Sequence, residues 1–291
     1  MSDVAIRSPL GPRAGTYVNP VGMVLGLLGK GNLIWQFASR ELLERHKGAM
    51  LGVLWNILSP LLQLTVYTFV FGFVLKVRWE NRGGSAWEGM DSHVSFALIL
   101  FCGHAVAHLF TESVNRAPNL VAGRPNLVRK VVFPLEILPV SVIVAGLVTL
   151  AVSYGILLVC VLAFAGKVPA TAPLAIVPVL PLIMLTVGVS WFLASLGVFL
   201  RDIRNIVQVV VHVIMFMSAV FYPIERVPEQ WRPLIQYNPL AVLIENTRRT
   251  LLWGEMPQWD RLLWVTLVAA VVMQVGYVWF MRTKRGMADV V

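Results

Sequence analysis

Six stretches of roughly twenty apolar residues dominate this chain, and a helix needs about that length to cross the hydrocarbon core of a bilayer. The composition agrees, because 57% of the residues are hydrophobic and only 13% are charged. We therefore predict an all-α membrane protein with six transmembrane helices. The predicted spans cover residues 53–75, 93–112, 138–165, 173–199, 207–222 and 262–281.

Lys and Arg residues are distributed unevenly among the predicted loops. Most of the 24 basic residues precede the first span or lie in the second-to-third loop, the fourth-to-fifth loop and the C-terminal tail. Loops rich in Lys and Arg stay on the cytoplasmic side, so both termini are predicted to be cytoplasmic. Acidic residues nearly balance the remaining basic residues in the outer loops. The net charge of +9 therefore indicates topology and not nucleic-acid binding.

The segment before the first span has two parts. Residues 1–30 lack the apolar core of a cleavable signal peptide and are predicted to form a mobile cytoplasmic leader. Residues 31–50, GNLIWQFASRELLERHKGAM, are apolar first and charged later, which predicts an amphipathic helix at the cytoplasmic interface with Asn32 as its N-cap. The alternative is a basic anchor beside the membrane with no further role.

Two loops contain helix signals. Pro125 suits the first turn of a helix and Pro134 would end it, so residues 122–134 predict a short cytoplasmic helix or, alternatively, a basic loop that holds the topology.

In the outer segment 223–261, Asn238 and Pro239 predict the start of a helix of about fourteen residues, too short to cross the membrane. It either re-enters the membrane partway or lies flat on the outer surface.

Polar and aromatic side chains recur at helical spacing on the first and fifth spans. The first span carries Asn56, Ser59, Gln63 and Tyr67, and the fifth carries Gln208, His212, Met215, Phe216, Ala219 and Tyr222. Because polar groups facing lipid are costly, both stripes should face protein or water. They either line a pathway for a hydrophilic cargo such as a sugar chain or hold helices together by hydrogen bonds.

Residues with catalytic or metal-binding chemistry are scarce. His104, His108 and Glu112 follow one another at four-residue intervals, a pattern that would suit a metal site or proton relay, but no third ligand is evident and a polar packing stripe is favoured. The sequence has no phosphate-binding loop, no G-x-S-x-G elbow and no H-E-x-x-H pair. We predict no cofactor in this chain, and any ATP hydrolysis requires a separate polypeptide.

Three ordered motifs carry a family resemblance. The run from Arg40 to Pro60, RELLERHKGAMLGVLWNILSP, resembles the start of the first span in ABC-2 type exporter permeases, in particular the branch that exports O-antigen, capsule and teichoic-acid polysaccharides. FLRDI at residues 199–203 resembles the turn before the fifth span. FYPI at residues 221–224, followed by YNPL at residues 237–240, resembles the family's later signatures. The resemblance covers roughly residues 30–285, including a transmembrane domain at residues 53–285.

This resemblance implies a non-enzymatic half-transporter in the bacterial inner membrane that forms a homodimer and pairs with two copies of a cytoplasmic ATPase. The ATPase would bind ATP and Mg²⁺, and the cargo would be a polyprenyl-diphosphate-linked polysaccharide. The implied roles are ATPase coupling for Pro125, Asn126, Leu127, Arg129 and Lys130; substrate access at the interface for Trp35, Arg40, Arg45 and Lys47; channel lining for Asn56, Ser59, Gln63, Tyr67, Gln208, His212, Phe216 and Tyr222; and a periplasmic gate of re-entrant helices at residues 223–261 with Tyr237, Asn238 and Pro239.

Two other functions stay open. An ABC-2 permease for a small hydrophobic molecule or lipid would favour an apolar pathway, and Gln63, Gln208 and His212 argue against it. A membrane enzyme acting on polyprenyl lipids would need clustered carboxylates or a His/Asp set at one interface. The identity of the glycan also stays open, as does the alternative that the basic residues near the interface are ordinary topology anchors.

Overall fold

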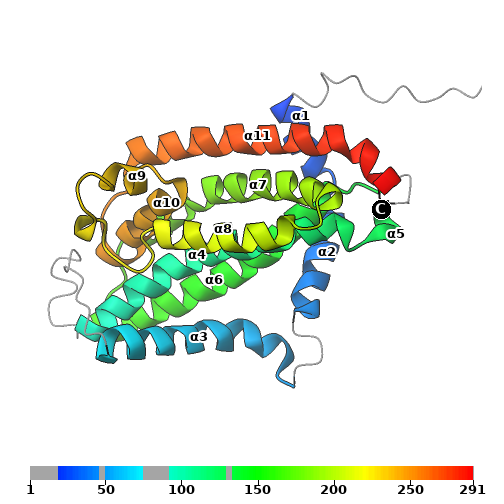
Figure 1. Cartoon of the computed structure of the whole chain (residues 1–291). Helices are drawn as coiled ribbons and strands as arrows, with labels where there is room; N and C mark the ends of the chain where they lie inside the picture. Colours follow the sequence, from blue (N-terminus) through cyan, green and yellow to red (C-terminus); the bar gives the residue numbers. More distant parts are fainter. Residues whose placement is uncertain (1–18, 46–49, 75–91, 129–132, 291) are drawn as a thin grey trace, which may run out of the picture.

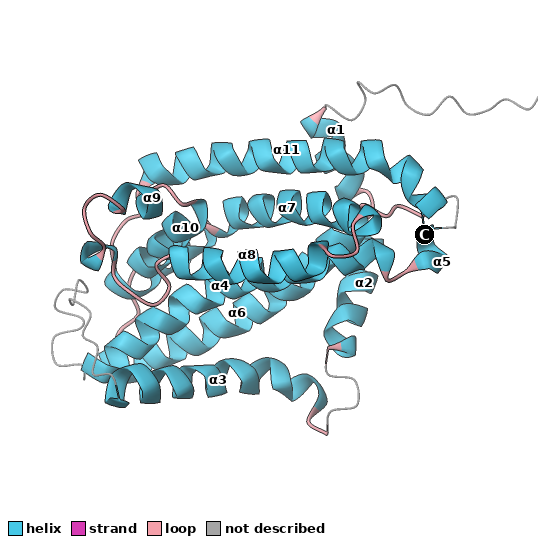
Figure 2. Ribbon diagram, viewed as in Figure 1, coloured by secondary structure: helices cyan, strands magenta, loops and turns pink. Residues whose placement is uncertain are grey.

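The fold is all-helical, as predicted. The structure, a computed structural model, describes residues 19–45, 50–74, 92–128 and 133–290. Within these ranges the regular elements are helices and no strand occurs (Figure 2).

The described elements follow in this order along the chain. The first half contains α1 (Pro20–Leu28), α2 (Gly31–Glu44), the 3-10 turn η2 (Gly52–Leu54), α3 (Trp55–Tyr67) with its π-helical continuation η3 (Thr68–Val74), α4 (Ser92–Ala122), α5 (Pro125–Val128) and α6 (Ile137–Ala165). The second half contains η5 (Ala172–Ile176), α7 (Val179–Phe199), α8 (Ile203–Met217), η6 (Ile224–Arg226), α9 (Arg232–Gln236), α10 (Pro239–Arg248), the π-helical η7 (Arg249–Trp253) and α11 (Trp259–Val290).

Figure 1 shows α3, α4, α6, α7, α8 and α11 running between two ends of an elongated bundle. At one end lie α1, α2, α5 and the C-terminal part of α11, and we call it the α5 end. At the other lie α9 and α10, and we call it the α10 end. Helix α2 lies across the bundle at the α5 end, the orientation expected of an interfacial helix.

Four stretches among the described residues are long and apolar enough to cross a membrane: Val94–Ala122, Ile137–Ala165, Ala172–Phe199 and Trp259–Lys284. They correspond to the predicted second, third, fourth and sixth spans. The predicted first and fifth spans form shorter apolar helices, Trp55–Phe71 and Ile203–Met217.

Helix α8 is shorter than the predicted fifth span. Its 15 residues end at Met217, and Ala219 follows with a φ of 51°. A non-glycine residue in this left-handed region stops an α-helix, so Tyr222 lies beyond the helix. At 1.5 Å per residue α8 is about 22 Å long, against about 30 Å of hydrocarbon.

Helix α1 corrects the prediction that residues 1–30 form a leader. Asn19 caps this helix, accepting hydrogen bonds from the backbone N–H groups of Val21 at 3.0 Å and Gly22 at 3.2 Å, and Pro20 occupies its first turn. Met23 is buried in the core. The part of the prediction that covers residues 1–18 lies outside the described residues, and the predicted N-cap Asn32 lies inside α2, which begins at Gly31.

Helix α4 is the most buried of the long helices. Small residues allow two of the other long helices, α7 and α11, to pack closely against each other. Gly188 of α7 and Gly276 of α11 lie so close that a Cβ on Gly188 would meet the backbone of Met273 at 2.6 Å. A larger residue at either position would push α7 and α11 apart. Small residues serve the same purpose in membrane helix interfaces generally, because close backbone approach maximises van der Waals contact.

Arg248 of α10 binds α4 and the turn that follows α8 through hydrogen bonds at the α10 end. Its side chain is 1% exposed, and its guanidinium donates hydrogen bonds to the backbone carbonyls of Ile99 (3.2 Å), Ala219 (3.0 Å) and Val220 (2.8 Å). Gly103 of α4 faces the guanidinium, and any side chain there would collide with it. Arg248 therefore joins α10 to α4 and to the turn that ends α8.

We expect Arg248→Met to destabilise the protein strongly. Three buried carbonyl groups would lose a charged donor, and hydrogen bonds to charged groups contribute about 1.5–3 kcal/mol each, so the loss should reach at least about 3 kcal/mol. Thermal unfolding in detergent measures it. The matched control is Arg40→Met, because the Arg40 side chain is 75% exposed. Equal melting temperatures for the two variants would contradict a structural role for Arg248.

Candidate functional site

The polar stripe of α3 lines a cavity that opens to the surface of the subunit, since Leu62 and Val66 in its lining are exposed. This cavity has a volume of about 500 Å³ and lies between α3, α4 and α6. Its polar lining comprises Ser59, Gln63, Tyr67, His104, His108, Thr149 and Ser153. Apolar side chains, among them Leu62, Val66, Leu109 and Leu150, complete the wall. A mostly apolar wall with a few placed polar groups is typical of a small-molecule site.

Tyr67 and His104 form the polar pair of this cavity, and their hydroxyl oxygen and Nδ1 atoms lie 2.9 Å apart. Aromatic rings lie next to Tyr67. Phe71 and Phe221 stack with their centroids 6.1 Å apart, and Tyr67 contacts both rings edge-on at 6.3 and 6.4 Å. Phe221 directly follows Val220, whose carbonyl binds Arg248, so these rings lie next to the turn that ends α8.

A second cavity, of about 420 Å³, continues the first toward α2. The two share Ser59, Pro60, His108 and Thr149 in their linings. The second is also lined by Arg45, Trp55, Asn56, Glu112 and Arg116. Together they form one polar passage along α3, with charged groups at the Arg45 end and uncharged groups near Tyr67. The predicted stripe from Asn56 to Tyr67 thus lies on this passage.

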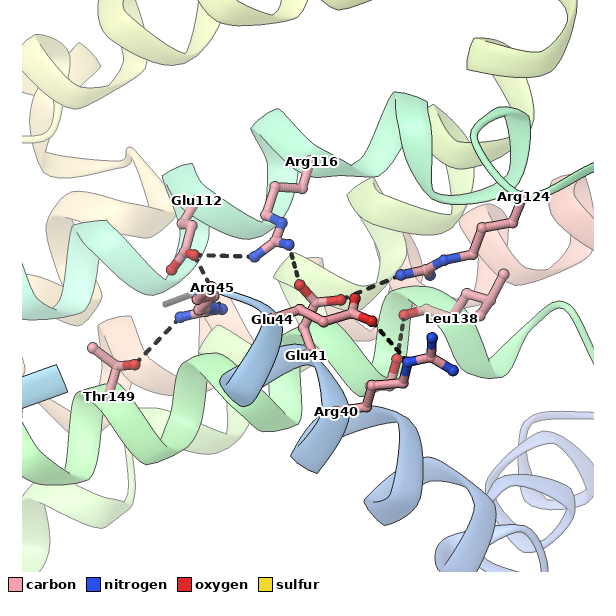
Figure 3. A network of polar contacts seen from close by, with 10 residues as sticks. Arg40, Glu41, Glu44, Arg45, Glu112, Arg116, Arg124, Leu138 and Thr149 are labelled. Carbon is pink, nitrogen blue, oxygen red and sulfur yellow. Dashed lines mark hydrogen bonds and ion pairs between the residues drawn. The ribbon is translucent and has the colours of Figure 1, made fainter. Parts of the chain in front are cut away.

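Alternating charges connect α2 to α4 (Figure 3). The buried Glu41 carboxylate of α2 pairs with Arg116 and, at 3.4 Å, with Arg124. Glu112 of α4 pairs with Arg45 at 3.0 Å and with Arg116 at 3.4 Å. Arg45 also donates to the Thr149 hydroxyl of α6 at 3.4 Å. The end of α2 is therefore fixed to α4 by ion pairs and to α6 by a hydrogen bond.

The predicted access residues divide into three groups. Arg45 is engaged in this network, whereas Arg40 is largely exposed and pairs with Glu44 of its own helix at 2.7 Å. Trp35 is 57% exposed on α2. Lys47 lies outside the described residues.

The predicted helix at residues 122–134 is only partly described. Helix α4 continues through Ala122, and α5 is a single turn of four residues. Pro125 and Asn126 are exposed and Leu127 is half-buried, while Arg129 and Lys130 lie outside the described residues. A hollow of about 310 Å³ separates α5 from α2, with Phe37, Arg40, Glu44, Arg124, Pro125, Asn126 and Leu127 in its lining.

The polar stripe of α8 faces away from the cavity. Gln208, His212 and Phe216 line an open groove on the surface of α8 together with Val209, Val213 and Met217. His212 Nδ1 lies 2.6 Å from the Gln208 carbonyl oxygen of its own helix. Tyr222 donates to the Phe216 carbonyl at 2.8 Å. Within one subunit the α3 and α8 stripes therefore line different surfaces.

The predicted start of α10 is confirmed. Asn238 is its N-cap and accepts from the Leu240 N–H at 3.0 Å, and Pro239 is the first helical residue. The Asn238 amide also donates to the Met217 carbonyl at 3.2 Å, which fixes α10 to the end of α8. Tyr237 is 63% exposed, with its ring 5.9 Å from that of Trp264.

The His104, His108 and Glu112 series is divided among different partners. His104 faces Tyr67, whereas Glu112 faces Arg45 and Arg116 and lies 3.6 Å from His108 Nδ1. Among the described residues no group of three or more His, Cys, Asp or Glu side chains could hold a metal ion.

Sequence reasoning did not identify Glu136, which joins three elements at the α5 end. Its carboxylate, only 6% exposed, accepts hydrogen bonds from Lys30 at 2.5 Å and Lys284 at 2.7 Å. Its backbone carbonyl accepts from the Trp191 indole N–H at 2.9 Å. Burial opposes ionisation, but the two lysine hydrogen bonds outweigh it and hold the pKa of Glu136 below its ordinary value.

We expect the stabilisation from Glu136 to depend on pH. Because the pKa of this carboxyl is lower in the folded state, its contribution is complete above the unfolded-state pKa of about 4.3 and is lost as the pH falls through the folded-state pKa. Glu136→Gln should therefore lower the melting temperature at pH 7, and the difference from wild type should shrink below about pH 4.

The matched control is Glu44→Gln, because Glu44 is 42% exposed and pairs within one helix. It should change the melting temperature little at any pH. A pH-independent effect of Glu136→Gln would indicate that packing, not charge, holds this junction.

Comparisons with known proteins found a matching family and several relatives. Residues 32–252, from α2 to η7, match the model of the ABC-2 type transporter family. The chain is similar to the O-antigen export system permease protein RfbA of Myxococcus xanthus, with 27% identity over 245 residues that cover 83% of this chain and 88% of that protein. A protein of the same description from Klebsiella pneumoniae is 25% identical over 266 residues, 89% of this chain and 95% of its own. The polysialic acid transport protein KpsM of Escherichia coli is 22% identical over 251 residues, 85% of this chain and 92% of its own.

Proposed function

Because this chain belongs to the ABC-2 type transporter family, we propose that it is the permease subunit of an ATP-driven polysaccharide exporter in a bacterial inner membrane. One observation carries the proposal: the chain is similar, over most of its length and of theirs, to permeases and transport proteins named for O-antigen and polysialic acid. The substrate is a polysaccharide linked to a polyprenyl diphosphate.

The proposed topology has six passes, with α3 and α8 as the two short ones, and places the α5 end in the cytoplasm. Basic residues at that end support this orientation: Lys30, Arg40, Arg45, Arg124, Arg201, Arg204, Arg282 and Lys284. Helices α9 and α10 then lie on the periplasmic side as a re-entrant gate. The burial of α10, from Leu240 to Ile244, supports a position within protein and not flat on the surface.

The substrate reaches the transporter beside α2. Arg40 is largely exposed on this helix and Trp35 projects from it, a combination suited to an interface with anionic headgroups. Arg45, with Lys47 close to it in the sequence, adds positive charge where a diphosphate arrives. The polar passage along α3 begins at Arg45.

A second copy of the chain covers the groove on α8. Gln208 and His212 are exposed there, and polar side chains in contact with lipid are costly. Pairing two subunits through this face brings the groove into a shared pathway, with Phe216 as an aromatic surface for sugar rings. The homodimer thus places both α8 stripes on the export route.

Two copies of a cytoplasmic ATPase, which bind ATP and Mg²⁺, dock at the α5 end. Exposed Pro125 and Asn126 are available for this contact, and Arg129 and Lys130 continue the same segment in the sequence. Arg124 precedes α5 and pairs with Glu41 of α2. A displacement of α5 by the ATPase is therefore passed to the helix beside the substrate.

ATP hydrolysis in lipid nanodiscs tests this function. The chain is purified with the cytoplasmic ATPase encoded next to it, and turnover is measured with and without a polyprenyl-linked glycan. We expect stable co-purification and glycan-stimulated turnover. In the double variant Arg129→Glu with Lys130→Glu, the stimulation should be lost by at least about tenfold, because charge reversal opposes docking.

The control is Lys167→Glu, which reverses an exposed charge in the loop after α6. This variant should keep glycan-stimulated turnover. Failure to bind any ATPase would overturn the transporter proposal, and stimulation by small hydrophobic molecules but not by glycan would favour the alternative cargo.

A further inference from the structure

We propose that the cavity between α3, α4 and α6 is a binding site for a single uncharged sugar ring. This inference rests on the proposed polysaccharide cargo and specifies which part of it the subunit recognises. The cavity volume, about 500 Å³, lies within the range of small-molecule sites.

The lining offers the chemistry that a ring bearing several hydroxyl groups requires. Ser59, Thr149 and Ser153 supply hydroxyl groups that both donate and accept hydrogen bonds. The Gln63 amide adds donors and an acceptor on the α3 side. The ring of Tyr67 provides an aromatic face for the C–H side of a sugar.

His104 provides the strongest indication of a missing ligand. Its side chain is 7% exposed and lines the cavity, and Nδ1 faces the Tyr67 hydroxyl. The buried Nε2 atom has no hydrogen-bond partner among the described residues. A buried polar atom without a partner costs about 1–3 kcal/mol. A sugar hydroxyl satisfies Nε2 in either tautomer, because a hydroxyl group can donate or accept.

The absence of charge near Tyr67 decides the class of sugar. Among the described residues no Asp, Glu, Lys or Arg side chain lines this cavity, and the charged groups of the adjoining second cavity, Arg45, Glu112 and Arg116, pair with one another. An anionic sugar would have to leave water without a counter-charge, at a high cost. The cavity therefore selects neutral hexoses and deoxyhexoses over uronic or sialic acids.

Saturation-transfer NMR on the chain in nanodiscs tests the site. The probes are the methyl glycosides of glucose, mannose, galactose and rhamnose, with methyl glucuronide as the charged comparison. We expect saturation transfer to at least one neutral glycoside and at least about tenfold weaker binding of the glucuronide. Gln63→Leu and Ser59→Ala should each weaken the neutral glycoside about three- to tenfold, the effect of one lost hydrogen bond.

The control is Asn205→Leu, which also replaces an amide by Leu, on an exposed residue in the first turn of α8, and should leave the affinity unchanged. Thermal unfolding of each variant confirms that it folds. In the wild type, the imidazole nitrogen signals of His104 should also shift when the glycoside binds.

Three results would overturn the site: no transfer to any neutral glycoside, equal binding of the glucuronide, or unchanged affinity in both Gln63→Leu and Ser59→Ala. Glycan-stimulated ATP hydrolysis by the wild-type complex separates this failure from that of the export function. If stimulation persists while no glycoside binds, only the site is wrong. If stimulation itself is missing, the polysaccharide cargo is wrong.

Discussion

Helix α4 contacts α3, α5, α6, α7, α8 and α10, and the subunit is assembled around it. Its apolar residues, from Phe96 to Val121, are almost completely enclosed by protein. Enclosure by protein allows α4 to carry polar groups that lipid would not tolerate. His104 opens onto the uncharged cavity, and Glu112 and Arg116 join the charged network nearer α5.

Buried charges occur at both ends of the bundle and differ in character. At the α10 end, Arg248 binds backbone carbonyls, so its contacts fix geometry without requiring a particular partner side chain. At the α5 end, Glu41 and Glu136 bind Lys and Arg side chains from several helices. Side-chain ion pairs rearrange more readily than a guanidinium held by backbone, which suits an end where we propose that a partner ATPase acts.

Composition alone predicted the long helices, because a run of apolar residues has few alternatives to a membrane helix. The start of α10 could also be predicted from the sequence, because the N-cap Asn238 and Pro239 in the first turn are adjacent in the chain. Asn19 and Pro20 form the same combination of N-cap and first-turn Pro at the start of α1, but they lie in the segment predicted to be a leader. The burial of Glu41 could not be predicted from the sequence, because its partner Arg116 lies 75 residues away and no residue near Glu41 indicates the pairing. For the same reason the spacing on α3 predicted a polar face but not that α4 and α6 would enclose it.

The positions of Arg248 and Lys284 have a consequence for the order of folding during synthesis. Arg248 reaches back 149 residues to Ile99, and Lys284 reaches back 148 residues to Glu136. Neither end of the bundle can be completed until the last helices have left the ribosome, although α4 and α6 are made early. A chain truncated before α10 would therefore retain its apolar helices but leave the ends of α4 and α8 unfixed.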